Sequence, residues 1–343
     1  MQELTQTKQQ IYKALHHLAE TGDAAQIYTD DAKLFATHPF NEMQGIDAIT
    51  AFWAQLHKSF PDMERRDSIF VGGLSKPDSR TPEHAEGRLL IASMGVYQAR
   101  FQSDFCGIQA TGGLVHLRFS EIHQIEDDKI IHSYVMLDIL NLLHQIGAWP
   151  LVPSLGYEGM WPGPKTGDGL RLSETDAEAG EAGFQTVVAM HNGLLSFDGK
   201  NIDSMDHARF WTENFLWYGP AGIGSTRAMH GFRAHHQIPF LRAFPDRQGS
   251  GHYVRIGDGN FAVTGGWPSV RCSHQGEFLG VAPTGRDIQM RVIDFYRIEG
   301  GQIAENWVPI DILHILLQMG VDVLGRMAHR NGAFPTEIFP NSD

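Results

Sequence analysis

Two aspartates stand at positions where a carboxyl group could transfer protons. Asp138 and Asp311 each lie where a strand-like run gives way to an apolar helix. A carboxyl group buried in an apolar pocket has a raised pKa and can act as a general acid or base. The N-terminus of a helix favours the anion instead, and an aspartate there often serves only as the helix cap. Both roles stay open for these two residues.

A second pair of acids, Glu121 and Asp294, lies in the middle of strand-like runs. Because side chains alternate along a strand, Asp294 shares one face with Met290, Val292 and Tyr296. An acid among apolar neighbours indicates a pocket. An ion pair with an arginine on a neighbouring strand would explain the same position, so this alternative also stays open.

Aromatic residues are concentrated after residue 210 and could line such a pocket, offering a Tyr hydroxyl or a Trp N–H to a ligand. The candidates are Trp217, Tyr218, Trp267 and Trp307, with Met290 as an apolar neighbour. Aromatic residues in strands can equally belong to the core. His230 and His274 could carry protons or bond a substrate, or they could be ordinary surface and core histidines.

Several other kinds of chemistry lack their usual patterns. The histidines form no His-x3-His or His-x-His pair backed by an acid, so no metal site is expected. The glycine-rich loop at residues 219–224 lacks the lysine of a phosphate-binding loop, and the chain has no Gly-x-Ser-x-Gly motif. We therefore expect neither a metal nor an organic cofactor.

The candidate acids come in pairs because the chain repeats itself. Residues 100–147 and 273–320 align without a gap at an offset of 173, and 16 of the 48 paired positions are identical. Tyr134 in the first copy pairs with Trp307 in the second. A repeat of this length indicates two copies of one structural unit.

The predicted elements follow the same order in both copies, with helices before a series of long strands. Helices are expected at residues 7–20 and 45–59, and again at 178–196, 203–214 and 231–244. This order is typical of an α+β fold with antiparallel sheets. We expect a first domain at 1–147, a Pro- and Gly-rich docked linker at 148–177, a second domain at 178–330 and a tail at 331–343.

The bulk properties exclude some functions and leave an ordinary globular protein. The chain has 343 residues and a net charge of −13, which argues against binding to nucleic acid or an anionic membrane. The two cysteines form no disulfide framework, and no apolar run is long enough to span a membrane. The polar N-terminus resembles no signal peptide, so a cytoplasmic location is expected.

Two motifs in the second copy read MRVIDFYRIEGGQI and ENWVPIDILHILLQMG, with WYGPAGIG and AFPDR upstream. These motifs resemble those of the SnoaL-like polyketide cyclases, which belong to the nuclear transport factor two-like superfamily. The resemblance covers most of residues 180–325 and, more weakly, residues 8–147. It implies a curved antiparallel sheet wrapped around helices as a cone with a deep apolar pocket. It also implies aldol cyclisation without a metal or organic cofactor, with one aspartate as acid and base.

The position that matches the family's aspartate is Asp311, with Asp138 as its first-copy equivalent. Because Tyr134 replaces the motif tryptophan, we expect the first site to be degenerate. The catalytic candidates are Asp311, Asp294 and His274; the substrate-binding candidates are Trp217, Tyr218, His230, Trp267, Met290 and Trp307; the first-copy equivalents are Asp138, Glu121 and Tyr134.

The sequence thus predicts a cofactor-independent acid/base enzyme acting on a hydrophobic, carbonyl-bearing small molecule. Aldol cyclisation is the reaction implied by the family, and a lyase, dehydratase or isomerase would use the same chemistry. A non-catalytic small-molecule binding protein is the alternative. Since cone domains of this group often pair through their sheets, we expect the copies to form an internal pseudo-dimer, and a homo-oligomer stays open.

Overall fold

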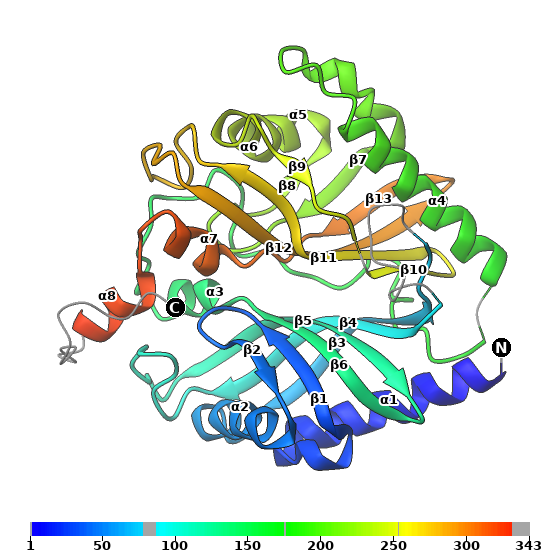
Figure 1. Cartoon of the computed structure of the whole chain (residues 1–343), viewed down its shortest axis with the longest axis vertical. Helices are drawn as coiled ribbons and strands as arrows, with labels where there is room; N and C mark the ends of the chain where they lie inside the picture. The colour runs from blue at the N-terminus through cyan, green and yellow to red at the C-terminus, as the bar shows by residue number, and fades with distance from the viewer. Residues whose placement is uncertain (1, 78–86, 175, 253, 331–343) are drawn as a thin grey trace.

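Two sheets lie face to face across the middle of the molecule, and the longer helices cover their outer faces (Figure 1). The structure is a computed structural model and describes residues 2–77, 87–174, 176–252 and 254–330. The expected tail at 331–343 lies outside the described residues. The mixed α+β fold class that the sequence predicts is confirmed.

The first half forms a sheet with strand order β2-β1-β6-β5-β4-β3. Neighbours are antiparallel except β1 and β6, which are parallel. Its elements are α1 (Gln2–Thr21), β1 (Tyr28–Ala36), β2 (Asn41–Gln44), α2 (Ile46–Ser59), β3 (Glu64–Leu74), β4 (Leu89–Arg100), β5 (Leu114–Glu126), β6 (Lys129–Leu137) and α3 (Ile139–Gln145). Helix α2 buries Ile49, Phe52, Trp53 and Leu56, the apolar stripe expected of a helix that packs on a sheet.

The second half forms a sheet with strand order β10-β11-β12-β13-β7-β8, and β9 pairs with β11. Its strands are β7 (Trp211–Tyr218), β8 (Thr226–Arg227), β9 (Gln248–Gly249), β10 (Val254–Asp258), β11 (Phe261–Ser273), β12 (Asp287–Glu299) and β13 (Gln302–Trp307). Its helices are α4 (Ala177–Leu194), α5 (Ala228–Phe232), α6 (Ile238–Ala243), α7 (Ile312–Gln318) and α8 (Val323–Arg330). The helix expected at 203–214 is wrong, because this segment forms two 3-10 turns and then enters β7.

Two pairs of corresponding elements in the halves begin and end at equivalent residues. Strands β5 and β12 are offset by 173 at both ends, and so are helices α3 and α7. The strand orders of the two sheets also correspond one to one, with β8, β7 and β13 in the places of β2, β1 and β6. Identical pairs such as Arg118 and Arg291, or Leu140 and Leu313, therefore lie at the same place in matching strands and helices.

The layer between the sheets is a hydrophobic core distinct from the one under the helices. It consists of buried residues from both halves: Ile69, Val71, Leu90, Ala92, Met94, Ile122, Met136, Tyr218, Val254, Ile256, Phe261, Val263, Ile293, Phe295 and Trp307. One buried ion pair, Lys8 to Asp258 at 3.0 Å, also joins the halves. The connecting segment contacts both halves as well, since Phe70 donates its N–H to Gly169 and Gly156 donates to Ile223.

Candidate functional site

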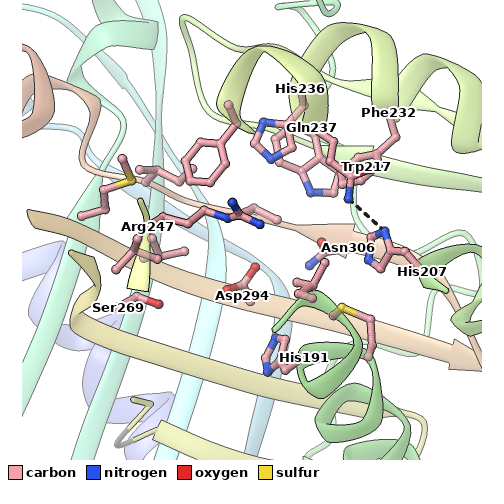
Figure 2. Close-up of a pocket in the computed structure, with 18 of the residues that line it drawn as sticks. His191, His207, Trp217, Phe232, His236, Gln237, Arg247, Ser269, Asp294 and Asn306 are labelled. Carbon is pink, nitrogen blue, oxygen red and sulfur yellow. Dashed lines mark hydrogen bonds between the residues drawn. The ribbon is translucent and has the colours of Figure 1, made fainter. Parts of the chain in front are cut away.

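A cavity of about 220 Å³ lies inside the second half, between its sheet and the helices that cover it (Figure 2). Its apolar wall consists of Met190, Leu194, Met205, Trp211, Trp217, Phe232, Phe240, Leu241, Val270, Met290, Val292, Val308 and Ile310. Such a wall suits a hydrophobic small molecule, and the few polar groups among it would fix the orientation of that molecule.

Strand β12 supplies the floor of the cavity. Met290, Val292, Asp294 and Tyr296 all line it, as the period-two alternation of a strand requires. The pocket face that the sequence predicts for this strand is therefore the face that borders the cavity.

Asp294 is the acid of this cavity, and its residue is only 9% exposed. Burial raises the pKa of Asp294 to about 7, although hydrogen bonds with the side chains of Asn306 and Tyr296 act in the opposite direction. The amide of Asn306 also donates to the carbonyl oxygen of Phe295 at 3.0 Å, which fixes its orientation. A carboxyl group with this pKa is present in both protonation states near neutral pH, as a general acid/base requires.

A series of polar groups leads from Asp294 toward helix α4. The Tyr296 hydroxyl lies 3.1 Å from Nε2 of His191. The His191 ring is 5.0 Å from the ring of His252, whose Nε2 lies 2.7 Å from Oγ of Ser269. Because all of these groups line the cavity, they could exchange protons with Asp294 or with a bound molecule.

The opposite wall carries two histidines, of which His207 is buried and His236 half-buried. Trp211 Nε1 donates to Nε2 of His207 at 3.0 Å, and Nδ1 of His207 lies 3.2 Å from Nε2 of Gln237. His236 stacks on Trp217 with ring centroids 4.1 Å apart. Burial lowers the pKa of His207 to about 4 and that of His236 to about 3, so both are neutral at neutral pH.

The local helix geometry explains how this wall forms. Residues 233–237 make a π-helical turn between α5 and α6. Such turns widen a helix locally and are frequent at functional sites. Here the turn ends with His236 and Gln237, which both line the cavity.

The cavity continues outward into a second space of about 300 Å³. The two spaces share several residues, among them His191, Phe240, Arg247 and His252. The outer space is bordered by the end of α4 and by residues around β9, including Phe197 and Gly249. A ligand longer than the inner cavity would therefore extend past Arg247.

The structure separates the sequence-predicted residues into two groups. Asp294, Met290 and Trp217 line the cavity. Tyr218, Trp307 and Trp267 lie in or against the layer between the sheets instead. Adjacent residues of a strand point to opposite faces, so the expectation that Trp217 and Tyr218 line one pocket together is wrong.

The aromatic residues between the sheets have structural partners there. Tyr218 stacks on Trp307 with ring centroids 5.0 Å apart, and Trp307 Nε1 donates to the carbonyl oxygen of Pro162 at 2.9 Å. The guanidinium carbon of Arg291 lies 5.0 Å from the ring centroid of Trp267, and Trp267 also packs against Tyr134. These contacts explain the aromatic content of the repeat without a ligand.

Asp311 lies outside the cavity lining and caps helix α7. Its carboxylate accepts from the backbone N–H of His314 at 3.2 Å and of His38 at 2.9 Å, and from Arg291 at 3.1 Å. Burial raises the pKa of Asp311, and the positive charge of Arg291 partly offsets this. The cap interpretation of this residue therefore has direct contacts in its favour.

The two predicted histidines are also outside the cavity lining. His230 in α5 is exposed. His274 is buried, with Nδ1 3.1 Å from Oγ1 of Thr284 and its ring 5.8 Å from that of Phe244. Burial lowers the pKa of His274, so it is a neutral core histidine.

In the first half, the equivalents of the site residues are engaged with one another or with the second half. Glu121 accepts from Arg65 at 2.7 Å and from the Tyr97 hydroxyl at 2.5 Å. Burial opposes ionisation, but the charge of Arg65 lowers the pKa of Glu121 to about 2. Asp138 caps helix α3, and Tyr134 packs between the sheets. For Glu121, the ion-pair alternative that the sequence left open is the one found.

Several cavity residues were not selected from the sequence: His191, His207, His236, Gln237, Arg247, Ser269 and Asn306. They come from α4, a 3-10 turn, the π-helical turn, the loop before β9, β11 and β13. Two of them belong to motifs in the sequence, Arg247 to AFPDR and Asn306 to ENWVPIDILHILLQMG. Tertiary packing alone brings the others together.

The described part of the chain contains no cluster of three or more His, Cys, Asp or Glu side chains arranged to hold a metal ion. Within the same residues, every helix is too short or too polar to cross a membrane.

The SnoaL-like polyketide cyclase family matches residues 196–319, so the second half contains a SnoaL-like domain. A search of the curated proteins gave no match. Among solved structures, IdmH from Streptomyces antibioticus is similar at 23% identity, over 40% of this chain and 99% of its own, with a TM-score of 0.33. TsrD from Streptomyces laurentii is 16% identical over 41% of this chain and 96% of its own, with a TM-score of 0.31.

Proposed function

We propose that the second half is a cofactor-independent acid/base enzyme of the cyclase type, acting on a hydrophobic, carbonyl-bearing small molecule. The observation that carries this proposal is Asp294, a carboxyl group with a pKa of about 7 in a mostly apolar cavity. The SnoaL-like match over residues 196–319 supports the same class of function.

In the proposed reaction, the Asp294 carboxylate removes a proton from the carbon next to a carbonyl group. The enolate carbon then forms a C–C bond with a second carbonyl carbon of the same molecule, and the new alkoxide takes a proton back from Asp294. Gln237 lines the cavity, and its side-chain amide can donate a hydrogen bond to the developing oxyanion. A lyase, dehydratase or isomerase would share the first step.

We propose further that the chain is a tandem of two SnoaL-like domains that pair through their sheets, with the working site in the second. The matching bounds of β5 and β12 and of α3 and α7 support the repeat. The shared hydrophobic layer supports the pairing. The ion pairs around Glu121 support a first domain without a working site.

Proton abstraction can be tested with 2-tetralone, a small aromatic ketone, by following deuterium uptake next to its carbonyl in D₂O by NMR. We expect wild-type protein to accelerate the exchange and Asp294→Asn to lose most of the acceleration, on the order of 100-fold. Glu213→Gln, which changes an exposed acid of β7, is the matched control and should exchange like wild type. Asp311→Asn tests the rival assignment, and loss of exchange in that variant alone would move the acid/base role to Asp311.

The alternative function is a binding protein that uses the same cavity without chemistry, and the apolar wall supports it equally. The two functions differ in the same assay. A binding protein would take up 2-tetralone without accelerating its exchange, and Asp294→Asn would then leave the exchange rate unchanged.

A further inference from the structure

Arg247 lies where the inner cavity joins the outer space. It follows α6, lines both spaces and is half-buried. Its guanidinium carbon lies 5.1 Å from the ring centroid of Phe197, a stacking contact that limits its rotation. Figure 2 shows the guanidinium group extending into the cavity, between Asp294 and Gln237 in this view.

The charge of Arg247 is not neutralised by the described part of the chain, where no carboxylate lies within ion-pair distance of it. Other buried arginines differ: Arg118 pairs with Asp138 at 3.4 Å and Arg291 with Asp311 at 3.1 Å. Burial lowers the pKa of Arg247 as well, which reflects the cost of placing this cation near apolar residues. An arginine stays charged under these conditions, so an anion brought by a ligand would be stabilised there.

We propose that Arg247 binds a carboxylate group of the ligand, whose apolar part fills the inner cavity beside Asp294. A planar guanidinium group matches a carboxylate through two parallel hydrogen bonds. The anion belongs at the Arg247 end because a second negative charge close to Asp294 would be repelled by the ionised base. This inference deepens the proposed function, on which it rests, by naming the substrate class as a hydrophobic carboxylic acid.

The site then has two ends with different tasks. Arg247 fixes the charged end at the junction of the two spaces, and Asp294 meets a carbon atom in the apolar part. This arrangement orients the ligand in one direction along the cavity, which brings the reacting carbon to the base.

The test uses two probes of the same shape, 2-naphthylacetic acid and its neutral amide, 2-naphthylacetamide. Calorimetric titration of wild-type protein should show the acid binding about 10- to 100-fold more tightly than the amide. Arg247→Met should remove this preference and leave the affinity for the amide within about twofold. Arg247→Lys should keep part of the preference, because lysine retains the positive charge but cannot form two parallel hydrogen bonds to the carboxylate.

The same titrations can overturn the inference. Carboxylate recognition would be contradicted if wild type bound the two probes equally or did not bind the acid. It would also be contradicted if Arg247→Met lost affinity for the acid and the amide to the same extent. Asp294→Asn should retain the preference for the acid even if it abolishes exchange. A failure of the acid/base proposal can therefore be distinguished from a failure of carboxylate recognition, since the first would appear in the exchange assay and not in the titration.

If Arg247 instead acted by holding Asp294 ionised, Arg247→Met would shift the pH profile of exchange and leave the preference for the acid probe intact. That result would also contradict the inference.

Discussion

Arg65 and Gly249 occupy equivalent positions in the two sheets. Arg65 pairs with Tyr97 in the first sheet, and Gly249 pairs with Val270 in the second, 173 residues after Tyr97. The Arg65 guanidinium group lies 4.4 Å from the ring centroid of Phe119. In the first half it therefore fills the region that corresponds to the cavity wall at Val292 and Asp294 in the second.

This exchange accounts for the different interiors of the two halves. Arg65 and Tyr97 bring polar atoms to Glu121 and satisfy it. Gly249 and Val270 provide neither a counterion nor the same bulk, so Asp294 stays beside an open space. The replacement of Arg65 by Gly249 and of Tyr97 by Val270 thus separates a salt-bridged interior from a candidate site.

Replacing Arg65 should lower the free energy of unfolding of the protein. Arg65→Met leaves Glu121 and Asp67 buried without their cation, and breaking a buried pair in this way costs about 3–5 kcal/mol. Urea unfolding measures the loss. The double variant Arg65→Met with Glu121→Gln should be more stable than Arg65→Met alone, because one uncompensated charge is removed. A loss of under about 1 kcal/mol for Arg65→Met would show that the network does not hold the first half together.

Asp294→Asn should stabilise the protein at alkaline pH. The pKa of Asp294 is raised from 3.8 to about 7 on folding, so the folded state holds the proton more tightly than the unfolded state. Stability from this group is present below the unfolded pKa and is lost as pH rises through 7. Wild type should therefore lose about 2–3 kcal/mol relative to Asp294→Asn between pH 5 and pH 8.

Thermal melting of both proteins at pH 5 and pH 8 measures this difference. Glu213→Gln, at an exposed position, should show no such pH-dependent gain. If Asp294→Asn were equally destabilising at both pH values, the carboxylate would be a structural group and its burial would carry no functional cost.

The sequence predicted the floor of the site because that floor is periodic. Asp294 and Tyr296 were placed on one face by strand alternation alone, and both line the cavity. The same alternation places Trp217 in the cavity and its neighbour Tyr218 between the sheets. His191 and Arg247 could not be assigned, because they lie on elements far apart in the chain and only packing brings them to one cavity.

The fold could be predicted from the sequence more fully than the site, and the reason is physical. A repeat constrains the order of the elements, and helix α2 (Ile46–Ser59) lies where the sequence predicts a helix at 45–59. A cavity depends instead on whether one position carries a large or a small side chain. The Arg65 and Gly249 pair lies outside the most similar stretch, so its importance appears only once the strands are paired.

The exchange reaction should depend on pH through Asp294. Since only the carboxylate removes a proton, the rate per bound 2-tetralone should rise through pH 7 and level off above it. Asn306→Ala removes a hydrogen bond that lowers the pKa of Asp294, so the midpoint should move to higher pH. NMR exchange rates from pH 5 to pH 9 measure both midpoints. A midpoint in Asn306→Ala at or below that of wild type would contradict the assignment of the base.

Asp138 and Asp311 form reciprocal contacts between the halves. Asp138 accepts from the backbone N–H of Ala221 at 3.1 Å, and Asp311 accepts from that of His38 at 2.9 Å. Each also caps its own helix and contacts an arginine. A contact that is made in both directions is typical of a twofold interface, here between the two halves of one chain.

The two contacts should differ in strength, and alanine substitutions test this. The side chain of Asp311 is fully buried, whereas that of Asp138 is 14% exposed, and Arg118 keeps a bond to the Glu158 carbonyl oxygen at 2.7 Å without Asp138. Arg291 likewise keeps its bond to Asn41 Oδ1 at 2.9 Å without Asp311, so the difference rests on burial and on the N–H groups that each carboxylate satisfies. Asp311→Ala should therefore cost about 3–5 kcal/mol by leaving two buried N–H groups unpaired and Arg291 without its counterion, and Asp138→Ala about 1–3 kcal/mol. Urea unfolding gives both values, and titration with 2-naphthylacetic acid under native conditions should show unchanged binding in each variant. If Asp311→Ala were as stable as wild type but no longer accelerated exchange of 2-tetralone, Asp311 would be the acid/base residue and the interface role would be wrong.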